Sequence, residues 1–278
     1  MRSRASYLLL LPSGLLIALF GYGLVRLLSA SVWIDGQLDF GEYRAFLDRP
    51  DYIAMLGRTL FVAAMTTVVS LVIGYPTAYF VARSGANRNL MLTLIIFPWL
   101  VSIVVRTYGW VVILGPRGMV NSFLTWVGVI DYPAKLMYNS FGVILGLVHV
   151  LCPFMIIAIL SILMHIERVL EEASMSLGAR PTYTFLHVLL PLSAPGILTG
   201  VTLVYLMATG AIVTPLMLGG LGDTMLGTEI FQQVFHFFDY PKAAALAAIL
   251  LVTALAVVLP LQWLERHLSL RLFGEGAA

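Results

Sequence analysis

Long apolar runs, separated by short polar segments, recur along almost the whole chain. A helix needs about 20 apolar residues to cross the hydrocarbon core of a bilayer. We expect a membrane-spanning helix over each of six runs: residues 7–28, 59–81, 90–114, 141–164, 187–218 and 243–264. Of the 278 residues, 60% are hydrophobic and only 11% are charged, whereas a soluble domain has about 25% charged residues. The sequence therefore predicts an all-α polytopic membrane protein with one transmembrane domain over residues 1–278.

Two of these runs need a closer description. The fifth contains prolines, so we expect bends at Pro191, Pro195 and Pro215. The first follows Arg2 and Arg4, as the apolar part of a signal peptide would. However, it is longer than the run of about 7–15 residues that is typical of a signal peptide. We therefore expect an uncleaved span.

Basic residues indicate which side of the membrane each loop faces, because cytoplasmic loops carry an excess of Lys and Arg. If the N-terminus is inside, the outer loops contain most of the acids and fewer basic residues. The inner segments then contain Arg2, Arg4, Arg83, Arg88, Arg168, Arg180, Arg266 and Arg271. We therefore expect both termini in the cytoplasm, together with a loop at about 167–187 between the fourth and fifth spans.

The loop at about 167–187 differs from the runs beside it. Residues 171–177 favour a short helix, because acids near a helix N-terminus interact well with its dipole. Ala173 is small and leaves room for another protein to approach. Gly178 permits a left-handed helix stop, and Pro181 can begin the next helix. These residues alone leave two interpretations open: a solvated loop, or an exposed helix–turn–helix that a partner contacts.

The same loop resembles the EAA loop of permease subunits in ATP-binding-cassette (ABC) importers. That loop has Glu-Ala-Ala, three residues, Gly, nine residues and Ile-x-Leu-Pro. This chain has Glu-Ala-Ser at residues 172–174, Gly178, and Val-Leu-Leu-Pro at residues 188–191, all at that spacing. The match favours the helix that a partner contacts, and it implies the type I ABC importer permease fold with six transmembrane helices.

Other stretches resemble the permease subunits of spermidine/putrescine importers. They are residues 106–110 (RTYGW), 118–128, 151–154 (LCPF) and 214–220 (TPLMLGG). With the loop, the resemblance covers roughly residues 5–265. It implies that the transported solute is a polyamine. Related permeases for other substrates share these stretches, so iron, phosphonate or sulfate is the alternative cargo.

The resemblance also implies a location and a set of partners. The chain would lie in the bacterial inner membrane beside a second, homologous permease subunit, a paralogue rather than an identical copy. Two cytoplasmic ATPase subunits would each hold one EAA helix, and a periplasmic binding protein would deliver the substrate. ATP binding would draw the two EAA helices together and open the permease outward. ATP and Mg²⁺ would be bound by the ATPase, and we expect no cofactor, metal ligand or catalytic residue in this chain.

Six residues of the loop are assigned to the ATPase contact by the resemblance. Glu172 would pair with a basic group on the ATPase, while Ala173 and Gly178 would allow close approach. The full set is Glu172, Ala173, Ser174, Gly178, Leu190 and Pro191.

Several other classes of function are disfavoured. Lys135 and Lys242 follow Ala134 and Pro241, so neither forms the Gly-Lys-Ser/Thr of a phosphate-binding loop. A net charge of +2 gives no argument for nucleic acid. The motifs Gly-x-Ser-x-Gly and His-Glu-x-x-His are absent, which disfavours an intramembrane enzyme. An ion-driven carrier needs ionisable residues in mid-span, and His149 alone is weak support for one.

The candidate pathway residues are charged or aromatic side chains near the spans. A charge inside the bilayer costs about 2.5–3.5 kcal/mol and marks a possible functional site. Arg106 would repel a cationic solute, so we expect it to be paired structurally rather than to bind cargo. Aromatic faces and carboxylates attract amines. The set is Arg106, Tyr108, Trp110, His149, Asp223 and Glu229, and a structural role is the alternative for each.

Overall fold

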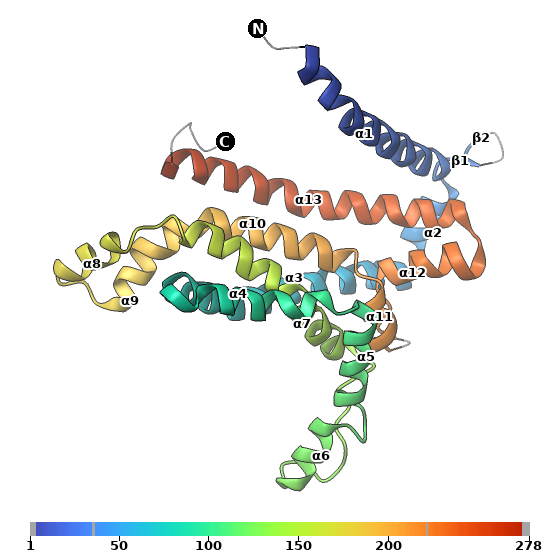
Figure 1. Ribbon diagram of the computed structural model, residues 1–278. Coiled ribbons are helices and arrows are strands. Elements are labelled where there is room, and N and C mark those ends of the chain that lie inside the picture. Colours follow the sequence, from blue (N-terminus) through green and yellow to red (C-terminus); the bar gives the residue numbers. More distant parts are fainter. Residues whose placement is uncertain (1–3, 35–36, 221, 274–278) are drawn as a thin grey trace.

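The computed structural model describes residues 4–34, 37–220 and 222–273, and it is almost entirely helical (Figure 1). The long helices are α1 (Arg4–Ala30), α3 (Pro50–Arg83), α7 (Ser140–Leu163), α10 (Leu190–Thr209) and α13 (Tyr240–Phe273). Five helical segments are long and apolar enough to cross a membrane, or six if one sharply bent pair is counted as a span. The expectation of an all-α polytopic membrane protein is therefore confirmed.

Short elements join the long helices. Near the first and last spans are the antiparallel strands β1 (Trp33–Ile34) and β2 (Gln37–Leu38), helix α2 (Gly41–Asp48) and helix α12 (Leu226–Gln232). A π-helical turn, η4 (Gln233–Phe237), follows α12. In Figure 1, α2 and α12 lie at one end of the molecule, and α8 (Arg168–Ser176) and α9 (Pro181–Thr184) lie at the opposite end.

The core is formed by α3, α7 and α10, which pack against one another. Its largest fully buried side chains include Met155, Ile159 and Leu163 of α7. Small residues allow close packing: a Cβ atom at Gly200 would lie 2.6 Å from the sulfur of Met155. Lipid is as apolar as such a core, so helices associate in a bilayer mainly through this kind of close contact.

Helix α1 lies apart from this core. It packs against α13, and Figure 1 shows it beside that helix on the side away from α7. No residue of its apolar part, Pro12–Ala30, is buried within this chain. Such a helix is compatible with lipid or with another subunit around it.

The third predicted span, 90–114, was wrong as a single helix. The structure has α4 (Arg88–Ile96), a 3₁₀ turn η2 (Phe97–Leu100) and α5 (Ile103–Leu114). The chain bends by 90° at the break between η2 and α5. Pro98 supplies no backbone N–H to a continuing helix, and Val101 adopts an extended conformation. Hydropathy cannot detect this break, because the residues on both sides are apolar.

The fifth predicted span, 187–218, was wrong at both ends. Its helix begins at Pro181 and ends at Thr209, and α11 (Val213–Leu218) is a separate helix. The helix continues through Pro191 and Pro195, with a π-helical turn, η3 (Phe185–Leu189), just before them. Gly210 caps the C-terminus of α10. The main break is therefore at a glycine rather than at these two prolines.

Helix α6 (Met119–Trp126) follows α5, and the two helices project away from the bundle (Figure 1). Asn121 is buried near the start of α6 and holds the adjoining loops. Its side chain accepts a hydrogen bond from the N–H of Ala134 at 2.8 Å and donates one to the carbonyl of Gly115 at 3.0 Å. The short segments on either side of α6 are thus hydrogen-bonded in place.

A close contact between α7 and α11 gives a test of this packing. A Cβ atom at Gly146 would lie 2.6 Å from Leu218 Cδ1 and 2.7 Å from Thr214 Cγ2, whereas one at Gly57 of α3 would meet nothing within 4 Å. We expect Gly146→Ala to destabilise the protein by about 1–3 kcal/mol through overpacking. Gly57→Ala is the control, because it makes the same gain in helix propensity without a clash. Thermal unfolding of the two purified variants in detergent measures their melting temperatures. Equal melting temperatures would contradict the close contact at Gly146.

Candidate functional site

Helix α8 is an exposed element at one end of the bundle. Glu172 and Ala173 are both exposed, and none of the residues of α8 is fully buried. Glu171 lies in its first turn, where the helix dipole favours an acid, and Glu172 follows it in the middle of this nine-residue helix. The predicted short helix at the start of the loop is therefore present, and its surface is open to a partner.

The end of α8 is fixed by its glycine. Gly178 has φ +89°, a left-handed conformation that side chains with a Cβ atom rarely adopt. Its N–H donates to the carbonyl of Met175 at 2.9 Å, and the N–H of Ala179 donates to that of Ser174 at 3.2 Å. These two bonds form a Schellman motif. Pro181 then begins α9, so the predicted helix–turn–helix is confirmed.

An ion pair fastens α8 to the end of α3. A carboxylate oxygen of Glu171 accepts a hydrogen bond from the guanidinium of Arg83, and both side chains are largely buried. The Tyr79 hydroxyl donates to the other oxygen at 2.9 Å. Arg83 also donates to the carbonyl of Ile166, and Arg168 donates to the carbonyl of Arg83. A displacement of α8 therefore pulls directly on α3.

A second attachment joins α8 to α10 through α9 and η3. The hydroxyls of Ser174 and Thr184 are 2.9 Å apart. Further along, Phe185 meets the ring of Tyr75 edge to face at 5.4 Å, and the Tyr75 hydroxyl is 2.9 Å from the hydroxyl of Ser193. Because α10 continues directly from η3, α8 is connected to two helices of the core.

The six predicted coupling residues therefore have different surroundings. Four belong to α8 and its turn: Ser174 is bonded within the loop, while Glu172, Ala173 and Gly178 are exposed. Leu190 and Pro191 lie in the first turn of α10, away from α8.

Sequence reasoning missed the residues that hold α8, namely Glu171, Arg83 and Tyr79. Adjacent residues on a helix face different ways, so of the two neighbouring acids Glu171 and Glu172 one faces the bundle and the other solvent. The pair of adjacent acids was the sequence signal that could have indicated a contact between this helix and the bundle. Which of them faces the bundle depends on Arg83, which lies 88 residues earlier in the sequence.

Beside α8 is an open groove of about 820 Å³ between its turn and α9. Leu177 is 89% exposed, Tyr183 54% and Leu186 52%, so much of this surface is apolar. Arg180 and His187 contribute polar groups. A contiguous exposed apolar surface with polar groups at its edge is typical of a protein interaction site.

Two of the six candidate pathway residues lie together. The indole N–H of Trp110, on α5, donates to His149 Nδ1, on α7, at 3.0 Å, and the two rings meet edge to face. His149 is thus hydrogen-bonded between helices, which was the structural alternative for that residue.

Arg106 and Tyr108 also lie on α5, but neither forms a comparable side-chain hydrogen bond with another described residue. Tyr108 is 60% exposed, as are its neighbours on that face, Val105 at 61% and Val112 at 58%. Arg106 Nε and Nη1 are buried, yet no described residue accepts a hydrogen bond from them. The expected structural pairing of Arg106 is therefore not made by the described part of this chain.

The two candidate carboxylates bond to their own chain. Asp223 accepts a hydrogen bond from Ser140 Oγ at 2.7 Å and lies 3.7 Å from Arg58 Nε. Glu229 accepts from Gln233 Nε2 at 2.7 Å. The structure therefore does not bring the six residues into one site.

The family described as "Binding-protein-dependent transport system inner membrane component" matches residues 70–273, which include α7, α8, α10 and the last part of α3. The chain belongs to this family. Its members are membrane components of transport systems, so the expected transport role, rather than an enzyme or an ion-driven carrier, is confirmed.

Similar proteins agree with this assignment. The spermidine/putrescine transport system permease protein PotB of Escherichia coli (strain K12) is 36% identical over 223 residues, covering 80% of each chain. PotB of Haemophilus influenzae is 32% identical over 202 residues, covering 72% of this chain and 71% of the relative. A bacterial ABC transporter involved in alginate import has the same fold, with a TM-score of 0.74 over 95% of each chain at 20% identity. The expected ABC importer permease fold is thus confirmed.

The ion pair below α8 generates a prediction about its attachment. Replacing Glu171 by Ala removes the acceptor of both Arg83 and Tyr79, and hydrogen bonds to charged groups contribute about 1.5–3 kcal/mol each. We expect the backbone amides of α8 to exchange hydrogen about 30-fold faster, which corresponds to a local opening free energy lower by about 2 kcal/mol. Hydrogen exchange with mass spectrometry measures this. Glu172→Ala, on the exposed face of the same helix, is the control, and equal exchange in both variants would contradict the attachment.

Proposed function

We propose that this chain is a permease subunit of an ABC importer and that it moves a polyamine across the bacterial inner membrane. The relatives named for spermidine and putrescine transport support this cargo, because they match the chain over most of its length. A different solute, such as iron, phosphonate or sulfate, is the alternative.

The observation that carries the proposal is the attachment of exposed α8 to two core helices. In the proposed mechanism, an ATPase subunit grips α8, with a basic group on Glu172 and close contact at Ala173 and Gly178. When two ATPase subunits close on ATP, α8 moves. The Glu171–Arg83 pair transmits this movement to α3, and the continuous path through η3 transmits it to α10.

The source of energy is a separate chain in this proposal. The lysines lack the Gly-Lys-Ser/Thr context of a phosphate-binding loop, so ATP and Mg²⁺ bind to the ATPase. The end that carries α8 is then cytoplasmic, with both termini on that side, as the arginine distribution predicts. The opposite end, with α2 and α12, faces the periplasm and its binding protein.

A second permease subunit is proposed to cover α5. On one face of α5, Val105, Tyr108 and Val112 are 61%, 60% and 58% exposed, and together they form an apolar surface that a neighbouring subunit would bury. This neighbour is proposed to be a paralogue rather than an identical copy, following the polyamine-type resemblance.

Selection of the cargo is assigned mainly to the binding protein. Asp223 and Glu229 already bond within the chain, and Arg106 would repel an amine. Tyr108 and Trp110 remain candidates for contact with a passing cation through their ring faces. The permease then acts chiefly as a gate with weak binding of its own.

The coupling role predicts a specific uncoupling variant. Gly178→Val places a β-branched side chain at φ +89°, so the helix end must rearrange. We expect transport to fall at least 10-fold while the ATPase hydrolyses ATP without stimulation by the loaded binding protein. Reconstituted proteoliposomes with all subunits measure both rates.

A matched control exists just after α6, away from α8. Gly128 has φ +77° with open space around it, so Gly128→Val causes similar backbone strain away from α8. We expect its transport to stay within about 2-fold of wild type. Normal coupled transport in Gly178→Val would refute the role of α8. A loss of the subunit from the membrane in both variants would instead indicate a folding defect.

The cargo has its own test, which does not depend on coupling. We expect the cognate periplasmic protein to bind spermidine or putrescine, and uptake of labelled polyamine into proteoliposomes to require ATP. Isothermal titration with polyamines, ferric iron, a phosphonate and sulfate distinguishes the candidates. Preference for one of the other three solutes would replace the polyamine and leave the permease role intact.

A further inference from the structure

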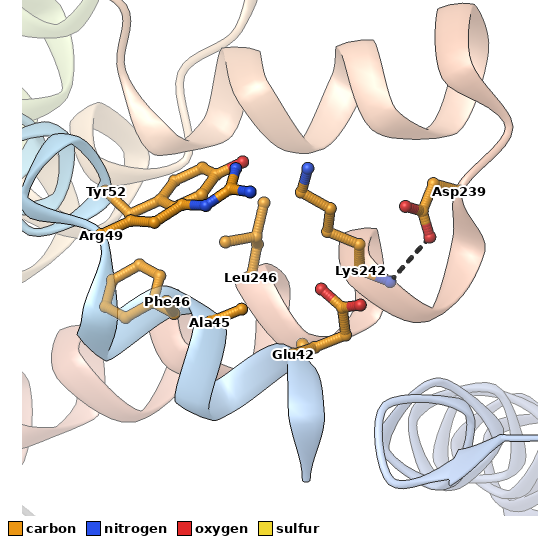
Figure 2. A pocket seen from close by; sticks show the side chains of 9 residues that line it. Glu42, Ala45, Phe46, Arg49, Tyr52, Asp239, Lys242 and Leu246 are labelled. Carbon is orange, nitrogen blue, oxygen red and sulfur yellow. Dashed lines mark hydrogen bonds between the residues drawn. The ribbon is translucent and has the colours of Figure 1, made fainter. Parts of the chain in front are cut away.

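A small charged pocket lies at the end of the molecule opposite α8, and none of the roles above uses it. It has a volume of about 180 Å³ and lies between α2 and the first turns of α3 and α13 (Figure 2). Glu42, Arg49, Asp239 and Lys242 line it, together with the ring of Tyr52. Two cations and two carboxylates thus share one cavity.

The apolar side of the pocket is formed by packed side chains. Phe46 is buried and stacks on Tyr52 with ring centroids 5.9 Å apart, and Leu246 is buried beside them. Both cations approach the Tyr52 ring: the Arg49 guanidinium carbon lies 6.0 Å from its centroid and Lys242 Nζ 5.5 Å. Figure 2 shows both cationic ends on the side of the Tyr52 hydroxyl.

The four charges are close together but are not directly paired. Within the described ranges, the ion pairs with N···O distances up to 4.0 Å are Arg58–Asp223 and Arg83–Glu171, which lie elsewhere. Asp239 Oδ1 accepts the backbone N–H of Lys242 at 3.2 Å and so caps the start of α13. Arg49 and Lys242 thus present two positive charges beside one ring, and neither makes an ion pair within 4.0 Å among the described residues, so an anionic group could bind between them.

A purely anionic or purely cationic ligand would not suit the whole cavity. Glu42 and Asp239 disfavour a simple anion, and Arg49 and Lys242 disfavour a simple cation. A zwitterion with a short spacing between its charges satisfies both ends. We propose that the pocket binds the headgroup of a phosphatidylethanolamine-type lipid, with its phosphate between Arg49 and Lys242 and its ammonium group near Glu42 and Asp239.

The position of the pocket fits a lipid headgroup. Arg49 immediately precedes α3, and Lys242 lies in the first turn of α13, so both charges are at the ends of membrane spans. Leu47, which follows the pocket residue Phe46 in α2, is 68% exposed, as an apolar side chain at the membrane interface would be. A bound headgroup would bridge α2 and α13. This inference depends neither on the cargo nor on the coupling of α8.

Native mass spectrometry of the purified protein tests the proposal. The protein in detergent is titrated with phosphatidylethanolamine or phosphatidylglycerol of equal chain length. We expect wild type to retain one phosphatidylethanolamine at least 5-fold more often than one phosphatidylglycerol. The double variant Arg49→Gln with Lys242→Gln should lose this retained lipid. The double variant Glu42→Gln with Asp239→Asn should lose the preference and bind the two lipids alike.

The control variants distinguish a loss of charge from a folding defect. A soluble competitor distinguishes binding of the whole lipid from binding of its free headgroup. Arg49→Lys with Lys242→Arg keeps both charges and should keep the lipid, whereas Lys135→Gln changes a lysine outside the pocket and should have no effect. Water-soluble glycerophosphoethanolamine should compete at least 100-fold more weakly than the lipid. Equal retention of both lipids by wild type, unchanged retention in the first double variant, or equal competition by the soluble headgroup would each overturn the proposal.

Discussion

A bilayer supplies no hydrogen-bond partners to the backbone, and this constraint determines most of the structure. Each long helix satisfies its own N–H and C=O groups, and buried hydroxyls follow the same rule, as when Thr67 donates to the carbonyl of Ala63. Irregular backbone is confined to a few breaks between helices, including Val101–Ser102 and residues 210–212. At membrane depth such breaks are tolerated only where protein or a water-filled cavity surrounds them. They are therefore the places where helices can change direction relative to one another.

Because α8 is attached to the bundle at two places, a movement of this surface helix also moves the core helices. The Schellman motif at Gly178 fixes the end of α8, and the Glu171–Arg83 pair fixes its first turn to α3. A buried ion pair adds little net stability, but losing one partner is costly, so the contact resists separation. Force applied to the exposed face is consequently passed to α3 and α10 together instead of being absorbed by a flexible loop.

The sequence predicts what depends on local patterns and misses what depends on distant contacts. Run length located the helices, and Gly178 with Pro181 located the helix–turn–helix, because both signals act within a few residues. The break at Val101 was missed because hydropathy is the same on both sides of it. Likewise, Glu171 and Glu172 are chemically identical in the sequence. Only the fold shows that Arg83 contacts Glu171. It also shows that no described residue accepts a hydrogen bond from Nε or Nη1 of Arg106.

The distribution of paired charges bears on how the protein selects what it moves. Glu171 is bound by Arg83 and Asp223 by Ser140, so these carboxylates are already engaged when a cation arrives. The unsatisfied charge on α5 is positive, at Arg106. If the cargo is the proposed polyamine, it gains little from the described charges of this chain and must be captured before it enters the membrane. Weak binding along the path would also let such a cation leave on the far side, because a tight intramembrane site would hold it there.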